Sequence, residues 1–330
     1  MVQKLNYDEL SQSGFLKLPE LLYDNIKIKQ VPNEIIEDDF VKALLIPEKG
    51  RLVLFHHPAM INQGVPYMTL GFFECIDDIE IARALFDAAR EVAIKLGIKS
   101  LVGPMNGNTW NAYRFMESGS TPLFLTEYYH HHYYLKLWEG GGFSPIAKYF
   151  SSIDMQLNLN EDINDEALEK KFKTEGINIR SINIALFEQE IGLIHEFCST
   201  YFVNNFLFTP IESNAFLAKY MPIKPLIDPG FVKIAEDENG KITALFFAIP
   251  DIYNSVTPTL VVKTIVRNPS RKYAGIIHLL GNLIVKEARK KGYLHMIHAF
   301  MHASNSSNKV SKKFSGEVFR SYVLFGNNIK

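Results

Sequence analysis

The apolar and polar positions of residues 259–300 follow a strand, helix, strand order. Residues Thr259–Val266 are mostly β-branched and apolar, which is typical of a strand buried on both faces. Between Ala274 and Lys291 apolar residues recur at the spacing of one helix face, at positions 276, 277, 280, 283, 284 and 288. Gly292 follows as a helix stop, and residues 293–300 are again apolar. The pattern predicts a helix between two buried strands.

The same order of elements occurs earlier in the chain. Each half begins with two apolar runs joined by a turn, and Asn239-Gly240 is a strong hairpin signal in the second half. The turn glycine and the helix-stop glycine both recur about 190 residues later, which indicates an internal repeat. The predicted elements are strands 40–46, 51–56, 67–75 and 98–102 with helix 79–96, then strands 231–235, 242–249, 259–266 and 293–300 with helix 274–291.

The repeat predicts two domains, residues 1–155 and 156–330. Residues Asn158–Glu175 are acidic and polar, and we interpret them as the bridge into the second copy.

The turn before the central helix differs between the two copies. The first turn, 74–78, carries Glu74, Asp77 and Asp78, whose charges repel a phosphate from a helix N-terminus. The second turn, 267–275, carries cations and a glycine, and such a turn offers an anion both charge and free N–H groups. A phosphorylated cofactor is therefore expected in the second copy, although a solvated basic turn explains the same residues.

Composition excludes several classes of protein. With 47% hydrophobic and 22% charged residues the chain is a folded globular protein, and its net charge of −1 disfavours nucleic acid as a partner. Cys75 and Cys198 form no disulfide framework or zinc motif. No apolar run has membrane-spanning length and the first residues carry no signal core, so we expect no membrane partner and a cytoplasmic location. The chain contains no Ser-His-Asp order, Walker loop or dinucleotide fingerprint.

The chain resembles the GNAT superfamily of N-acyltransferases, and more narrowly a group of tandem GNAT-like bacterial proteins of poorly defined activity. The resemblance covers most of residues 15–325 and implies an α/β (α+β) fold of two tandem domains, each a mixed, mostly antiparallel sheet with helices on both faces. The stretches that carry it are Gly71-Phe72-Phe73-Glu74, Gly103-Pro104-Met105-Asn106, Tyr133-Tyr134 ahead of Gly142-Phe143, Phe208-Thr209-Pro210-Ile211-Glu212, Pro225-Leu226-Ile227-Asp228-Pro229 and Pro250-Asp251-Ile252-Tyr253-Asn254.

The resemblance implies that acetyl-CoA, or another acyl-CoA, binds the second copy. The family holds CoA by main-chain groups of the strand before the central helix and by the following loop. These positions correspond here to Ile265, Val266, Arg267, Arg271, Lys272, Ala274 and Gly275. Aligned on Arg271, the loop keeps the cation of the family motif, but Ala274 and Ile276 replace its small residues. The branched side chain of Ile276 could crowd a pyrophosphate, which needs close approach of the loop backbone. Ser311 occupies the position where many members carry a tyrosine that protonates the leaving thiolate.

In a transferase an amine attacks the thioester, a main-chain N–H near 265–267 meets the oxyanion, and a nearby group accepts the amine proton. Asp251 is the first candidate base, although a turn carboxylate bound to backbone explains it more readily. His302 and Asn305 follow the last central strand and are further candidates, although a surface loop explains them equally well.

The remaining histidines and tryptophans predict structural roles. No metal site is expected at His130–His132, where packing against the flanking tyrosines explains the run better. Trp110 and Trp138 are expected in the core or at the domain interface.

The sequence therefore predicts an acyl-CoA-dependent N-acyltransferase acting on a small-molecule or peptide amine, as a monomer or homodimer, with a degenerate first domain that walls the cleft. The alternative is a non-catalytic GNAT-fold protein for ligand binding or interaction, which Ala274, Ile276 and the missing tyrosine favour.

Overall fold

The structure is a computed structural model that describes residues 1–119, 122–254 and 256–329. The described strands form one fourteen-stranded sheet. They are β1 (Gln3–Leu5), β2 (Phe40–Ile46), β3 (Gly50–Phe55), β4 (Ile61–Asn62), β5 (Val65–Cys75), β6 (Ser100–Gly103), β7 (Phe115–Ser118), β8 (Ser144–Asp154), β9 (Asn178–Ser181), β10 (Val232–Glu236), β11 (Ile242–Pro250), β12 (Thr259–Arg267), β13 (His295–His302) and β14 (Glu317–Asn328). The α-helices are α1 (Leu18–Leu22), α2 (Ile79–Lys95), α3 (Tyr134–Gly140), α4 (Asp165–Thr174), α5 (Phe187–Phe202), α6 (Ser213–Tyr220), α7 (Ile276–Lys290) and α8 (Ser307–Lys313).

The internal repeat predicted from the sequence is confirmed by the strand pairing. In the first half β2, β3 and β5 pair antiparallel, and β6 joins β5 in parallel after helix α2. In the second half β10, β11 and β12 pair antiparallel, and β13 joins β12 in parallel after helix α7. Each half is thus a mixed, mostly antiparallel sheet, as predicted.

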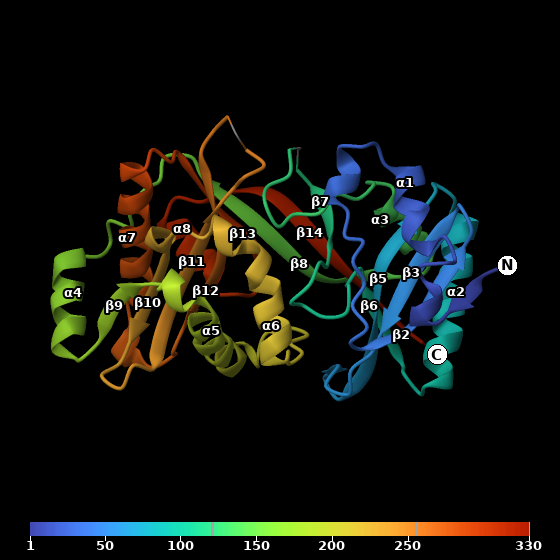
Figure 1. The fold of residues 1–330 in the computed structure, drawn as a ribbon, viewed down its shortest axis with the longest axis horizontal. Helices are drawn as coiled ribbons and strands as arrows, with labels where there is room; N and C mark the ends of the chain where they lie inside the picture. The colour runs from blue at the N-terminus through green and yellow to red at the C-terminus, as the bar shows by residue number, and fades with distance from the viewer. Residues whose placement is uncertain (120–121, 255, 330) are drawn as a thin grey trace.

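The two halves exchange strands at the centre of the sheet. The last strand, β14, pairs with β6 of the first half, and β8 of the first half pairs with β13 of the second. Strands β8 and β14 also pair with each other, and Figure 1 shows them crossing the middle of the molecule side by side. The predicted boundary at residues 155–156 falls just after β8 and stays a prediction.

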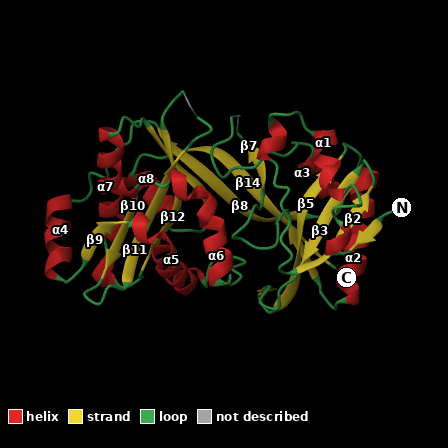
Figure 2. Cartoon of the chain, in the orientation of Figure 1, coloured by secondary structure: helices red, strands yellow, loops and turns green. Residues whose placement is uncertain are grey.

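Helices cover both faces of the sheet, as Figure 2 shows for each half. Helices α2 and α3 pack on one face of the first half, and the N-terminal segment with Leu10 and Phe15 packs on the other. In the second half α7 packs on one face and α5 with α6 on the other. No described helix is both long enough and apolar enough to cross a membrane.

The segment interpreted as a bridge, Asn158–Glu175, contains helix α4. The side chain of Asn164 caps this helix by accepting a hydrogen bond from the N–H of Ala167 at 2.9 Å. Phe172 is fully buried in the cluster that α7 covers. The segment is therefore part of the core of the second half.

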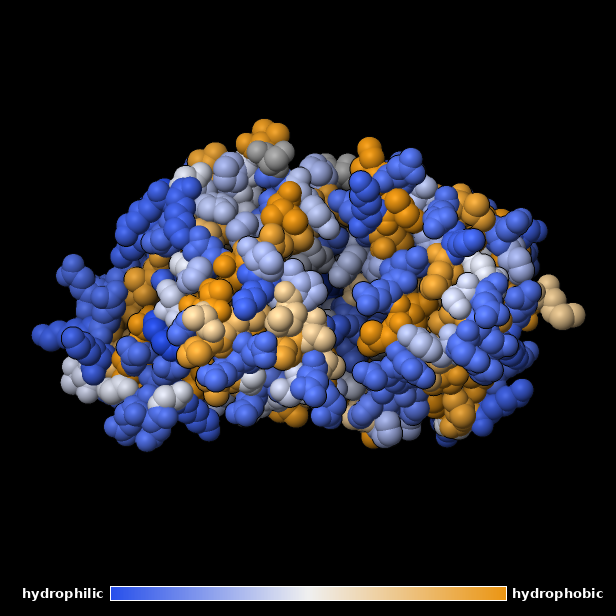
Figure 3. Space-filling model, viewed as in Figure 1, coloured by the Kyte–Doolittle hydropathy of each residue, from blue (hydrophilic) through white to orange (hydrophobic). Residues whose placement is uncertain are grey.

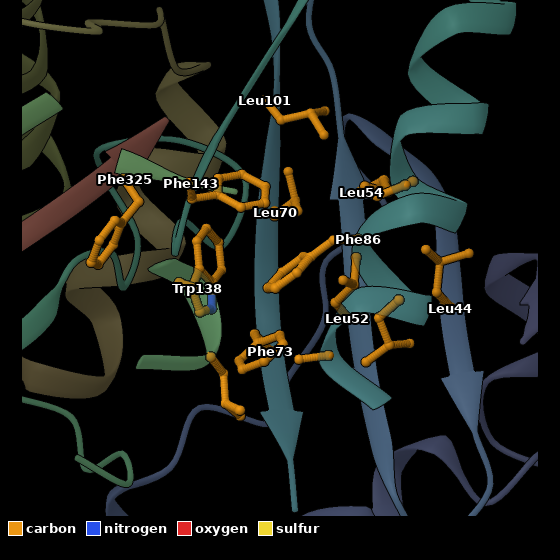
Figure 4. Packing of buried hydrophobic residues seen from close by; sticks show 14 of the residues in the cluster. Leu44, Leu52, Leu54, Leu70, Phe73, Phe86, Leu101, Trp138, Phe143 and Phe325 are labelled. Atoms are coloured by element: carbon orange, nitrogen blue, oxygen red, sulfur yellow. The ribbon is translucent and has the colours of Figure 1, made fainter. Parts of the chain in front are cut away.

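Trp138 lies at the centre of the core of the first half (Figure 4). It is fully buried, and Phe86 and Phe143 lie with ring centroids 5.2 and 4.7 Å from it. We expect Trp138→Ala to lower the free energy of unfolding by about 3–5 kcal/mol, because it removes the packed ring and leaves a cavity. Denaturant unfolding measures this, with Ile94→Ala as control, because Ile94 is 58% exposed on α2. Equal costs for the two variants would contradict the expectation.

Candidate functional site

Strands β12 and β13 separate after four paired positions, and this separation opens the site. Their parallel pairing ends at Val262 and His298. Beyond that point β12 continues along β11, with Lys263 as an extra residue in a bulge, and β13 continues along β8. The facing edges of the two strands are therefore unpaired.

A cleft of about 1070 Å³ occupies this opening and extends between the two halves. Figure 3 shows the molecular surface indented between the halves. Among the described residues most of the lining comes from residues 104–116 and 126–130 of the first half, and from 200–208, 262–267, 274–278, 298–302 and 305–313 of the second, with interruptions. Single residues of other segments, such as Glu74, Tyr149, Tyr220 and Tyr322, complete it. The cleft is large enough for an extended ligand.

The N-terminus of α7 faces this cleft. Gly275 is its N-cap residue, with φ +89°, and no side chain caps the helix. Ala274, Gly275 and Ile277 line the cleft. Ile276 is fully buried in the core instead, so its branched side chain does not crowd the loop as the sequence suggested. The unpaired N–H groups and helix dipole favour an anion here.

The cations around loop 267–275 and on helix α8 divide into two groups. Arg267 and Lys309 are exposed and line the cleft. Arg271 and Lys272 are exposed in a short 3₁₀ turn and are not among the described lining residues. Ile265 and Val266 line the cleft on β12, and β11 pairs with them on the other side.

The candidate catalytic residues lie in different places. Asp251 is outside the described lining, and its carboxylate accepts from the N–H of Leu125 at 2.8 Å and of Tyr253 at 3.2 Å. This is the turn role that the sequence offered as an alternative. His302 and Asn305 both line the cleft.

His302 and Ser311 differ in whether they can exchange a proton with a ligand in the cleft. Burial lowers the pKa of His302, and its Nδ1 lies 3.2 Å from the N–H of Ser304. The ring is therefore neutral at pH 7. Ser311 is 1% exposed and lies against Gly316, so it offers the cleft no acid.

The equivalent opening in the first half is closed by its own chain. After β6, Met105 donates its N–H to the carbonyl of Leu70 at 2.7 Å. The side chain of Asn106 accepts the N–H of Phe72 at 2.8 Å, and a Cβ on Gly71 would lie 2.6 Å from the Cα of Asn106. No space is left between these two strands.

The N-terminus of α2 is also occupied, because Asp78 caps it by accepting the N–H of Glu80 at 2.9 Å. The acidic turn therefore satisfies its own helix. Phosphate binding in the first half is disfavoured by both charge and geometry.

The histidine run packs against aromatic rings, as predicted. The ring of His131 stacks on Tyr23 and Tyr133 at 4.6 and 4.9 Å, and Nε2 of His130 accepts the N–H of Met116 at 2.7 Å. The described residues contain no group of three or more potential metal-ligating side chains.

Several residues that line the cleft were not selected from the sequence. Lys263 lies at the bulge of β12, and Arg114 and Glu127 reach the cleft from the first half. His298 is 2% exposed with both ring nitrogens unpartnered, and burial lowers its pKa to about 4. In the sequence, Lys263 inside the apolar run 259–266 was the signal that could have indicated these residues.

No family model and no curated protein matches the chain. Solved structures do match, over nearly its full length. A tandem GNAT protein from the clavulanic acid biosynthesis pathway covers 99% of this chain and 98% of its own, with 11% identity and a TM-score of 0.53. A GCN5-related N-acetyltransferase from Anabaena variabilis covers 100% of this chain and 73% of its own, with 8% identity and a TM-score of 0.56. Eis1 from Mycobacterium abscessus covers 99% and 73%, with 9% identity and a TM-score of 0.55.

The chain has the tandem GNAT fold. At these identities the likeness concerns the fold alone, and the pairing described above agrees with it. The GNAT-like unit with an open cleft is the second one.

Proposed function

We propose that the protein is an acyl-CoA-dependent N-acyltransferase that acts on an amine and works in its second GNAT-like unit. The separation of β12 and β13 at Val262 and His298, which opens towards the uncapped N-terminus of α7, carries this proposal. The closed opening of the first unit supports the same assignment, because only one of the two copies has kept the space.

Backbone groups and cations of the second unit would hold the cofactor. Ile265 and Val266 would offer main-chain groups to the pantetheine, and the amides that follow Ala274 and Gly275 would hold the pyrophosphate. Arg267, with Arg271 and Lys272 further out, would add positive charge around the phosphates. The positive φ of Gly275 fits a loop whose backbone must approach a ligand closely. Bound acyl-CoA would supply the acyl group as a thioester.

The chain's own groups would then handle the charge and the proton. The unpaired edge of β12 after Val262 provides main-chain N–H donors for an oxyanion. His302, neutral at pH 7 and in the cleft, is the group we propose to take up or return a proton, with Asn305 beside it. Asp251 would act indirectly, because it ties loop 122–127 to the second unit through Leu125.

One observation favours a non-catalytic alternative. Ser311 stands where many GNAT enzymes carry a tyrosine, and its side chain is buried. A protein that binds a ligand in this cleft without acyl transfer remains the second candidate function.

Calorimetric titration with acetyl-CoA and with free CoA tests the proposal. We expect micromolar binding at one site per chain, followed by CoA release when an amine is added. Arg267→Glu with Lys309→Glu should weaken binding at least 10-fold, because two phosphate-attracting charges are reversed. Arg271→Glu with Lys272→Glu is the matched control with the same charge change outside the lining, and we expect a smaller loss. Absence of heat at millimolar CoA would reject the proposal, and binding without turnover would select the alternative.

A further inference from the structure

The charges of the cleft identify a class of acceptor. We propose that the acceptor amine carries a carboxylate, and that Lys263 and Arg114 bind this group. This inference rests on the proposed function, because it concerns the second substrate of the same site.

The two residues lie on the face of the sheet opposite α7. Lys263 has its ammonium 5.1 Å from the ring centroid of Tyr220, a residue of α6. The guanidinium of Arg114 stacks on Phe300, which packs with the core under α5 and α6. Because the phosphate-binding end of the cleft is on the α7 face, the opposite face is where a second substrate would meet the acyl group.

Lys263 offers the cleft a cation without a counter-ion. Its side chain is accessible from the cleft, and it has no ion pair with a described carboxylate. Desolvation by the protein around the cleft, followed by repulsion from Lys219, lowers the pKa of Lys263 to about 8 even though water reaches the side chain. Nζ of Lys219 in turn donates to Oδ1 of Asn111, which lines the cleft. A bound anion would relieve this concentration of positive charge.

Arg114 is held rigidly at the edge of the cleft. Its guanidinium carbon lies 3.9 Å from the ring centroid of Phe300 and 4.0 Å from that of Tyr113. Nε and Nη1 are enclosed without a hydrogen-bond partner, while the residue as a whole is half-buried and lines the cleft. A braced guanidinium suits a carboxylate oxygen, since little side-chain entropy is lost on binding.

Among the described residues the two carboxylates that line the cleft are bound mainly by other groups, and Glu127 interacts with one of these cations, Arg114, through its charge. Glu74 is buried and accepts hydrogen bonds from Tyr23 at 2.5 Å and Tyr134 at 2.8 Å. Glu127 is buried in an ion pair with Arg320 and accepts from Tyr322 at 2.6 Å. The acceptor side therefore keeps an excess of positive charge, which would also favour the neutral, nucleophilic form of the amine.

Paired acceptors test the proposal. After CoA binding has been measured, CoA release from acetyl-CoA is followed with glycine against glycinamide, β-alanine against β-alaninamide, and a dipeptide with uncharged side chains against its C-terminal amide. Binding of glutarate and glutaramide to the CoA-saturated protein is measured by calorimetry alongside. We expect at least one carboxylate probe to exceed its amide 10-fold in kcat/KM, and glutarate to bind more tightly than glutaramide.

Variants connect the preference to the two residues. Lys263→Met should abolish the carboxylate preference with CoA affinity unchanged, and Lys263→Arg should keep it. If Lys263 instead acted as the general base, Lys263→Arg would lose activity, because the arginine guanidinium stays charged and cannot accept a proton. Arg114→Met should also abolish it; if that variant does not fold, Lys263→Met decides.

The pH dependence is a further readout. Lys263 is cationic below about pH 8 and neutral above it, in surroundings that include Lys219, Tyr220 and Cys198. KM or Kd for the carboxylate should therefore rise above pH 8 in the wild type and stay flat in Lys263→Arg. Equal use or equal neglect of each acid and its amide, while CoA still binds, would overturn the inference and leave the proposed function intact. Loss of CoA binding itself would remove the proposed function first.

Discussion

A chain that ends at Gly316 will not fold, because it lacks the strand at the centre of the shared sheet. Strand β14 lies between β6 and β8, and its removal exposes an edge of each. It also removes Tyr322 and Phe325 from two cores and leaves the buried Glu127 without Arg320. Loss of a buried partner alone costs about 3–5 kcal/mol. Since total stability is of order 5–15 kcal/mol, we expect no cooperative unfolding transition.

Deletion of residues 1–5 is the matched control. This deletion removes β1, which lies at the outer edge of the same sheet and contributes Leu5 to one small cluster. Circular dichroism and thermal unfolding should show a native-like protein for this variant and none for the chain ending at Gly316. A cooperative transition in the C-terminal truncation would mean that the halves are independent, contrary to the exchanged strands.

The elements of the repeat could be predicted from the sequence because their signals are local. The predicted helix 79–96 corresponds to α2, which spans Ile79–Lys95, and the predicted strand 40–46 matches β2 residue for residue. The exchange of β8 and β14 could not be predicted in this way. Each of them is an ordinary strand by composition, and its partner is set by packing between residues far apart in the chain.

The residues of the candidate site show the same difference between local sequence signals and packing between distant parts of the chain. Of the positions that the loop motif defines, Ala274 and Gly275 line the cleft, whereas Arg271 and Lys272 are not among the described lining residues. The concern about Ile276 was misplaced, because a helix N-terminus turns that side chain into the core while its backbone faces out. Arg114 gave no signal, since its place in the cleft depends on how the first half meets the second.

The first unit lines the cleft of the second, although its own opening is closed. The first unit closed its own opening with Asn106, and the loop that closes it, 104–116, also lines the cleft of the second. Trp110 from that loop donates its indole N–H to the carbonyl of Thr209 at 2.8 Å and packs on Phe216. The first copy thus forms a wall of the cleft, and the proposed acceptor side is built from both halves.

Gly275→Val will weaken CoA binding about 30-fold, or ~2 kcal/mol, with the fold retained. Gly275 has φ +89°, a conformation that costs a β-branched residue about 1–3 kcal/mol, and a Cβ there would lie 3.3 Å from Leu168. The loop would relax by moving the amides at the start of α7, and these are the groups proposed to hold the pyrophosphate.

Gly240→Val is the control. It carries similar backbone strain at φ +74° in an exposed hairpin where a Cβ has open space. Both variants are titrated with CoA, and thermal unfolding checks that they are equally stable. The comparison separates a general loss of stability from displacement of the amides at the start of α7. If both bind CoA as the wild type does, the start of α7 does not hold the phosphates, and the cations around Arg267 would have to bind them alone.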